Sequence, residues 1–396
     1  MHRVAALSST ALLALPGLIF VFVLLIAPVA WIFLQAFHEP SFVSVFPKAS
    51  AALREWEGKS RLPDMETMRV FEDELVAADR SGKLGQVLPI LNSDVAGFRS
   101  LIRNTLRYLH DSRDQPAEGS LLEADERWQD IRFWRALKRN SHRFTARNLL
   151  SALDLERDER DAIAAVDASR RVFIPTIVTT IEISLVVTFV SVALAYPLAY
   201  LISRSSPSVQ RFCLILLMIP FWTSFLVRIQ AWIVVLREDG ILNKMLLTTG
   251  AVDQPLVMLH NRFAVYVAMV HVSLPLAVLP IFSSVKGVDP KAMRAAMSLG
   301  AAWPRAFLTV FFPQTIRGVY WAMVMSFVLA MGYYLTPALL GGVHEQMISY
   351  WIAHYALQSG NWGMAAMLSI QLLVITAVFL VAFLFLTKIM ERMKYV

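Results

Sequence analysis

Long apolar segments constrain this chain more than any other feature of its 396 residues. Residues 4–37 contain no Asp, Glu, Lys or Arg, and about 20 apolar residues suffice for a helix to cross a bilayer. A cleavable signal peptide would have a shorter apolar core and a small-x-small site near its end, so we expect residues 9–37 to form a retained first helix. Five further segments are similarly apolar: 173–203, 212–236, 263–285, 317–342 and 362–387. The sequence therefore predicts an all-α polytopic membrane protein with six transmembrane helices.

The composition agrees with a membrane protein and excludes several other classes. With 57% hydrophobic residues, 17% charged residues and a mean hydropathy of +0.54, the chain is too apolar for a soluble protein of this size. Cys213 is the only cysteine, and the eight histidines show no metal-ligand spacing, so we expect no disulfide framework and no metal site. The net charge of +7 does not indicate nucleic acid, because residues 38–172 are balanced, with 22 Lys/Arg against 23 Asp/Glu.

The positions of Lys and Arg in the short loops predict the orientation, because cytoplasmic loops carry an excess of basic residues. With both termini in the cytoplasm, eleven basic residues lie on the cytoplasmic side: Arg3, Arg204, Arg211, Lys286, Lys291, Arg294, Arg305, Arg317, Lys388, Arg392 and Lys394. The opposite short loops hold three: Arg237, Lys244 and Arg262. The long loop is exempt, since large domains translocate largely regardless of charge. We therefore expect both termini in the cytoplasm.

Residues 38–172 differ from the rest of the chain because they are charged and mostly polar. Apolar stripes and capping residues predict four helices there: Asp64–Arg80; a second, capped by Ser93 or Asp94, that carries Val95 to Leu109; a third from about Leu121 to Arg139; and a fourth over Asp154–Arg171. We expect a helical extracytoplasmic insert between the first two transmembrane helices. Its role stays open between docking a solute-binding protein, covering the pore, and supporting stability or assembly.

The segment 286–318 is the longest polar interruption in the C-terminal two-thirds, and its helix signals are unusually clear. Asp289 can accept hydrogen bonds from a first turn, and the proline after it suits the first helical position. Small and flexible apolar residues then share one face: Met293, Ala296 and Met297. Gly300 can end this helix in a left-handed conformation. Pro304 then restarts a helix, and Pro313 kinks or ends the next segment. We expect a short exposed helical hairpin whose apolar face needs a partner; a plain connecting loop is the alternative.

This segment resembles the EAA loop of ABC-importer permeases, whose pattern is Glu-Ala-Ala, three residues, Gly, nine residues and Ile-x-Leu-Pro. Here Arg294-Ala295-Ala296 precedes Gly300 and the Val-Phe-Phe-Pro run that ends at Pro313, with both spacings kept. The resemblance implies a coupling helix that docks into a cleft of a cytoplasmic ATPase subunit. The coupling-loop residues that it implies are Asp289, Arg294, Ala295, Ala296, Gly300, Ala301 and Pro313. Arg294 replaces the family's usual Glu, so any ion pair of that Glu with the ATPase is lost or reversed here, and what compensates stays open.

The segment 220–250 resembles permeases of the spermidine/putrescine importer branch. It shares with them a Pro-Phe-Trp-Thr start, followed in order by an Arg, an Ala-Trp pair and a Gly-x-x-Asn pattern. Two other stretches also match that branch: Tyr196–Tyr200 and Leu335–Gly342. The resemblance covers about 9–37 and 173–396 and omits the insert, and Arg317 stands where the branch usually has Pro. It implies the type I ABC importer permease fold and a polyamine as the solute. Opines and amino-acid-like solutes remain alternatives, because selectivity in such systems resides largely in the binding protein.

Ionisable side chains inside a span are costly and mark candidate functional sites. Glu182 is the only acid well within an apolar segment, and its carboxylate would suit a polyamine, whose amines need charge-assisted hydrogen bonds once dehydrated. Alternatively, Glu182 stays wet near the outer surface or pairs with a base such as Arg228. Arg228 belongs to the resemblance pattern and is expected to be structural for the fold. Three aromatic residues complete the candidate translocation set, as cation–π partners or as packing and interfacial residues: Trp222, Tyr333 and Tyr334.

The sequence contains no motif for nucleotide binding or catalysis. Gly58-Lys59-Ser60 lacks the Gly that a phosphate-binding loop needs at position 53, where the residue is Leu53. No His-Glu-x-x-His run occurs, and no nucleophile–base motif is found. We therefore expect a non-catalytic subunit without its own cofactor, with ATP and Mg bound by a partner ATPase. An intramembrane enzyme and a proton-coupled secondary transporter are alternatives, although the second would leave the docking hairpin unexplained.

These observations predict a permease subunit of an ABC importer in the bacterial inner membrane. Its expected parts are a first transmembrane helix (1–37), a helical periplasmic insert (38–172), and a permease core of helices 2–6 (173–396) with the coupling loop at 286–318. The implied partners are a second permease, a cytoplasmic ATPase dimer, a periplasmic solute-binding protein and membrane lipid, with no nucleic acid. ATP-driven closure of the ATPases would move the hairpin and rock the spans. Whether a second copy or a sister permease completes the pore stays open.

Overall fold

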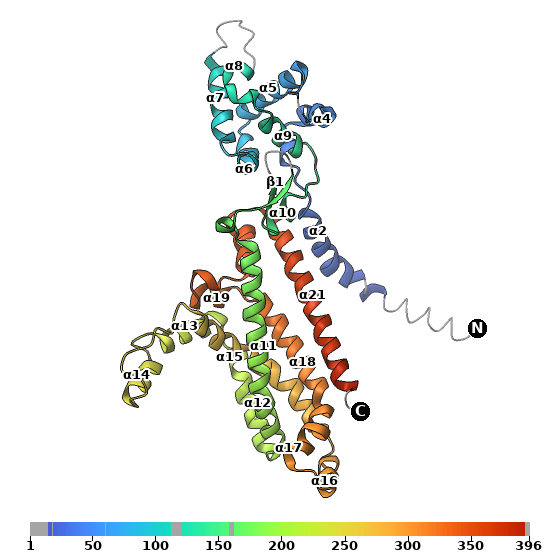
Figure 1. Cartoon of the computed structure of the whole chain (residues 1–396), viewed down its shortest axis with the longest axis vertical. Coiled ribbons are helices and arrows are strands. Elements are labelled where there is room, and N and C mark those ends of the chain that lie inside the picture. Colours follow the sequence, from blue (N-terminus) through green and yellow to red (C-terminus); the bar gives the residue numbers. More distant parts are fainter. Residues whose placement is uncertain (1–14, 18, 60, 112–120, 158–161, 393–396) are drawn as a thin grey trace, which may run out of the picture. The chain divides into compact units, whose positions relative to one another are not determined.

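The computed structural model describes residues 15–392 except 18, 60, 112–120 and 158–161 (Figure 1). The chain forms two compact units. The first contains residues 1–166 and 361–367, and the second contains residues 167–360 and 368–396. Helices dominate both units, which confirms the all-α polytopic membrane fold expected from the sequence.

The first unit begins with an apolar helix that is long enough to cross a membrane, Leu15–Gln35. It includes a π-helical turn, η1 (Phe22–Ile26), and α2 (Ala27–Gln35), and neither element buries a residue. A helix that is apolar on all sides is typical of a membrane span. Residues 9–14 of the expected first helix lie outside the described residues.

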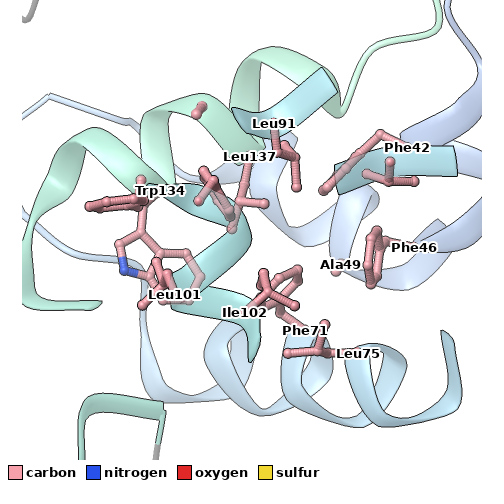
Figure 2. Packing of buried hydrophobic residues seen from close by; sticks show 14 of the residues in the cluster. Phe42, Phe46, Ala49, Phe71, Leu75, Leu91, Leu101, Ile102, Trp134 and Leu137 are labelled. Carbon is pink, nitrogen blue, oxygen red and sulfur yellow. The ribbon is translucent and has the colours of Figure 1, made fainter. Parts of the chain in front are cut away.

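The polar part of this unit is built from short helices around one core. Their bounds are α3 Ser41–Val45, α4 Pro47–Glu55, α5 Met65–Arg80, α6 Leu84–Asp94, α7 Phe98–Asp111, α8 Leu121–Ala124, η3 Glu126–Gln129, α9 Ile131–Asn140 and α10 Arg147–Ala152. Figure 2 shows the core, where Phe71 packs edge-on against Trp134. The indole of Trp134 is fully buried, and its Nε1–H donates to the carbonyl of Trp128 at 2.8 Å. Buried polar groups need such partners, and this bond supplies one for the Trp134 indole.

The structure confirms one predicted helix of the insert and changes the others. α5 begins after Asp64, whose side chain accepts the Thr67 N–H, as expected. The expected capping residues of the second helix, Ser93 and Asp94, instead end α6, and α7 starts at Phe98 after a glycine with φ of +91°.

The predicted third helix, 121–139, is divided into α8, η3 and α9. Asp125 caps η3 by accepting the Arg127 N–H, and Asp130 caps α9 by accepting the Arg132 N–H. Each aspartate offers the backbone a local hydrogen bond that starts a new helix. Two capping aspartates within ten residues therefore divide an apolar stripe that the sequence alone shows as continuous.

The predicted fourth helix over Asp154–Arg171 is wrong, because that segment forms a β-hairpin and a short 3₁₀ turn. Strands β1 (Leu155–Arg157) and β2 (Ile163–Ala165) pair antiparallel, with Glu156 opposite Ala164. Asp154 has φ of +50°, and its carbonyl accepts the Val166 N–H at 2.9 Å. A positive φ is incompatible with continuing a helix. The turn η4 (Ala168–Arg170) follows.

The second unit is centred on three long helices, α11 (Phe173–Arg204), α15 (Arg262–Lys286) and α18 (Phe312–Gly332), which run side by side (Figure 1). Small residues allow close approach: a Cβ on Gly318 of α18 would lie 2.6 Å from the Pro280 carbonyl of α15. Buried hydroxyl groups bond across the helices, as where Ser191 meets Ser273. Small and hydroxyl residues at helix interfaces are typical of membrane bundles.

Shorter elements and one further long helix complete the second unit. They are α12 Pro207–Trp222, α13 Phe225–Leu236, α14 Ile241–Thr248, α16 Pro290–Ser298, α17 Trp303–Ala306, η5 Phe307–Phe311, α19 Leu335–Leu340, η6 Val343–Glu345, α20 Ile348–Ala353, η7 His354–Gln358 and α21 Trp362–Arg392. The segment of α21 in this unit packs on α18, where Phe327 contacts the rings of Phe379 and Phe383.

Two predicted spans differ in the structure. The segment 212–236 is not one helix, because α12 and α13 meet at a 99° bend. Ser224 between them is extended, with ψ of 139°. The span expected at 317–342 lies nearer the N-terminus in the structure, where a continuous apolar helix runs over Trp303–Gly332. Five described helices are long and apolar enough to cross a membrane, or six if the bent pair counts as one span.

Candidate functional site

The hairpin 286–318 begins with the predicted helix start. The Lys291 N–H donates to Asp289 Oδ1 at 2.8 Å, and Pro290 occupies the first position of α16. The cap satisfies an amide that would otherwise have no partner in the helix. Asp289 is thus occupied within its own helix.

Gly300 ends α16 in the left-handed conformation, with φ of +91°. Its N–H donates to the Met297 carbonyl at 3.0 Å, and the Ala301 N–H donates to the Ala296 carbonyl at 3.1 Å. This pair of bonds is the Schellman arrangement that closes helix ends. Both ends of α16 are therefore set by local hydrogen bonds, as the sequence indicated.

After the turn, the chain re-enters a long helix through a π-helical turn. α17 starts with the expected proline in its first turn, and η5 (Phe307–Phe311) leads directly into α18. Pro313 lies in the first turn of α18, where its missing N–H has the least effect, and does not end the segment. Of the two expected effects of Pro313, a kink or an end, the end is wrong, because α18 continues through it; the turn before α18, η5, is π-helical.

The apolar face of α16 is divided between the chain's own core and the surface. Met293 is buried, and Ala296 and Ala301 pack against the same cluster. On the outer side, Leu299 is 90% exposed, with Met297 and Trp303 about half exposed. The expectation that the whole face needs a partner is therefore corrected to its outer half. The EAA-like residues Arg294 and Ala295 are exposed as well.

Glu182 forms an ion pair with Arg262, which joins α11 to the start of α15. Arg262 also approaches Glu345, with 3.5 Å between its Nε and Oε1 of the acid. Glu345 in turn accepts the Gly342 N–H at 2.9 Å. The Glu182 side chain is 44% exposed in the isolated chain, and its partner is Arg262 rather than Arg228. Sequence reasoning treated Arg262 only as a loop cation and missed Glu345.

Two of the other candidate translocation residues, Arg228 and Tyr333, lie near the bend between α12 and α13. Arg228 donates to the Thr223 carbonyl at 3.1 Å, and its guanidinium lies 5.8 Å from the Phe225 ring. Tyr333 stacks on that same ring at 5.7 Å between centroids. The structure thus brings Arg228 and Tyr333 together on Phe225, at the point where the span breaks.

Trp222 and Tyr334 do not join that stack. Trp222 is 90% exposed on the last turn of α12, where it lines a shallow apolar groove with Met218. Tyr334 is half-buried before α19. The residues expected to form a single pathway therefore fall into separate places within this chain.

Comparisons with known proteins found relatives by sequence and a neighbour by structure. No family model matches the chain. A bacterial ABC transporter involved in the import of the acidic polysaccharide alginate superposes with a TM-score of 0.49 and 15% identity, covering 81% of this chain and 98% of that chain. The spermidine/putrescine transport system permease protein PotB of Haemophilus influenzae is 30% identical over 213 residues, which are 54% of this chain and 74% of the relative.

A second relative is the inner membrane ABC transporter permease protein YdcU of Escherichia coli, which is 27% identical over 220 residues. That match covers 52% of this chain and 69% of the relative. Identity with PotB at this level over most of its length establishes common descent. The chain belongs to the family of ABC importer permeases that includes the spermidine/putrescine transport permeases.

Proposed function

We propose that this chain is the membrane permease subunit of an ATP-driven, binding-protein-dependent importer of polyamines, with spermidine and putrescine as the first candidates. The kinship with PotB supports both the transporter class and the solute. The chain would sit in the bacterial inner membrane with both termini in the cytoplasm, beside a second permease. A cytoplasmic ATPase dimer would bind ATP and Mg, and a periplasmic binding protein would deliver the solute.

The coupling part of this proposal is supported by the exposed apolar residues on the outer side of α16. Leu299, the C-cap of the doubly capped α16, is 90% exposed, so no described part of this chain covers its apolar side chain. Such surfaces mark protein contacts. The positive-inside arrangement puts the hairpin in the cytoplasm, where the ATPase would be. Closure of the ATPase dimer would then move α16 as a rigid body. Met293 and η5 would pass this movement to the bundle of α11, α15 and α18.

The proposal is tested by uptake of labelled putrescine and spermidine into cells that express the whole operon, with and without this subunit. ATP depletion should abolish uptake, and an uncoupler that leaves ATP intact should not. Uptake that follows the proton gradient would contradict the ABC mechanism and favour a secondary transporter. ATP-dependent function without polyamine uptake would retain the importer and replace the solute, with opines and amino-acid-like compounds tested next.

A further inference from the structure

A cleft of about 490 Å³ lies beside α16 in the second unit. The end of α11 forms one wall, and the hairpin forms the other. Its lining residues are Tyr200, Arg204, Pro290, Met293, Arg294, Met297 and Trp303. The two charged residues are both arginines, one from each wall, and the remaining lining is apolar or aromatic. The cleft is therefore a cationic site with low-polarity walls.

Neither arginine is neutralised by the described residues of this chain. Arg204 lies against two rings, with its guanidinium 5.2 Å from the Tyr200 centroid and 5.7 Å from that of Phe311. These cation–π contacts orient the guanidinium without cancelling its charge. In the part of the chain that the structure describes, no carboxylate lies within 4.0 Å of Arg204 or Arg294.

The nearest acid in sequence is also unavailable. The hairpin 286–318 contains five Lys/Arg and one acid, Asp289. Asp289 caps α16 by accepting the Lys291 N–H, so its carboxylate is engaged at the helix start. Two guanidinium groups that share one cleft repel each other, and that repulsion is relieved when an anion binds between them. Arginine binds carboxylates in a planar, bidentate geometry.

We propose that this cleft receives an acidic side chain, Asp or Glu, from the ATPase subunit, and that Arg204 and Arg294 hold its carboxylate together. This inference rests on the proposed coupling function and names the chemistry of the partner. The inference also accounts for Arg294 in place of the family's usual Glu. The ion pair with the ATPase is kept, but the permease now supplies the cation and the ATPase the carboxylate. Met297 and Trp303 exclude water around the pair and strengthen it.

The experiment measures ATPase affinity for the permease complex in lipid nanodiscs by titration. Arg294→Glu and Arg204→Glu should each weaken ATPase binding at least about 30-fold, which corresponds to about 2 kcal/mol. Arg211→Glu is the matched control, because it makes the same charge change on α12 and does not line the cleft. It should change the affinity less than threefold. Arg294→Lys should bind the ATPase more weakly than the wild type and more tightly than Arg294→Glu, because lysine keeps the charge and loses the bidentate geometry.

Rescue gives a second, independent readout that does not depend on stability. Replacing acids on the docking face of the ATPase one at a time by Arg, in the Arg294→Glu background, should identify one position that restores binding. Unchanged affinity for Arg294→Glu, while ATP-driven uptake continues, overturns the inference and leaves the proposed function intact. Equal losses for Arg294→Glu and Arg211→Glu overturn it too, since a diffuse charge effect would then explain both. A wild-type permease that binds no ATPase refutes the proposed function itself.

Discussion

Arg262 at the start of α15 is paired with Glu182 on α11, eighty positions away in the sequence, and the same guanidinium approaches Glu345. Two carboxylates thus share one guanidinium, so the three side chains together carry one negative charge. Glu182 and Arg262 are 44% and 40% exposed, and exposed pairs of this kind contribute about 1 kcal/mol or less to stability.

We expect Glu182→Gln to raise the KM for spermidine about tenfold, because a dehydrated amine would lose a charge-assisted hydrogen bond. Arg262→Gln should lower the KM for spermidine, because it removes the cation that competes with the solute for the Glu182 carboxylate. Initial uptake rates in proteoliposomes with the complete importer measure both. Unchanged KM values in the two variants would remove Glu182 from the translocation pathway.

Gly300→Val should abolish ATP-driven uptake while the complex still assembles in the membrane. The position has φ of +91°, where a β-branched residue is strained by more than about 1 kcal/mol, although a Cβ would meet no atom within 4 Å. The strain therefore acts on the turn after α16 and not on packing. Gly287→Ala is the control at the other end of the hairpin, because its φ is −77°. Uptake by Gly300→Val at the wild-type rate would contradict the coupling role of this turn.

Gly318→Ala should lower the melting temperature of the detergent-solubilised protein. An added Cβ would lie 2.5 Å from Ser284 Cβ and 2.6 Å from the Pro280 carbonyl, so α15 and α18 would have to separate. Overpacking of this kind costs about 1–3 kcal/mol. Gly332→Ala at the end of the same helix is the control, because nothing lies within 4 Å of its added Cβ. Thermal unfolding followed by circular dichroism compares them, and equal melting temperatures would argue against the close approach.

Asp125→Asn should destabilise the insert at neutral pH and lose that effect in acid. Hydrogen bonds from Arg127, at 2.9 Å and 2.6 Å, lower the pKa of the Asp125 carboxyl to about 2 from its ordinary 3.8. A carboxyl whose pKa is lowered on folding stabilises the protein above its unfolded pKa. That contribution, about 2 kcal/mol, is lost as the pH falls from about 4 toward 2. Urea titration at pH 7 and pH 3, followed by near-UV circular dichroism, measures the difference between variant and wild type. With a folded pKa of about 2, the difference at pH 3 should be about half of that at pH 7. A difference as large at pH 3 as at pH 7 would contradict the pairing with Arg127.

The features that could be predicted from the sequence are those encoded within a few residues. Asp289 before α16 and Gly300 after it were both identified from capping chemistry, because each acts on amides or carbonyls of its own turn. Long apolar runs predicted the spans over 173–203 and 263–285 nearly to the residue, since hydropathy and length alone decide them. The roles assigned to the coupling and translocation residues stay predictions.

The features that failed share a different cause. The bend after Trp222 lies between two helices that pass as one apolar segment, so hydropathy alone does not mark it. The hairpin after Asp154 depends on a positive φ that an aspartate adopts only in a suitable context. In both places the local sequence allows two conformations, and packing selects one.

The sequence by itself therefore determined that this protein is a helical membrane protein, and it determined how α16 begins and ends. Both follow from short-range physics: the hydrophobic length of a segment, and hydrogen bonds within one helical turn. Only the tertiary structure decided that Arg262 is the partner of Glu182, and that Arg204 and Arg294 line one cleft. Those relationships join distant helices, and no local pattern encodes which side chains the folded bundle brings together.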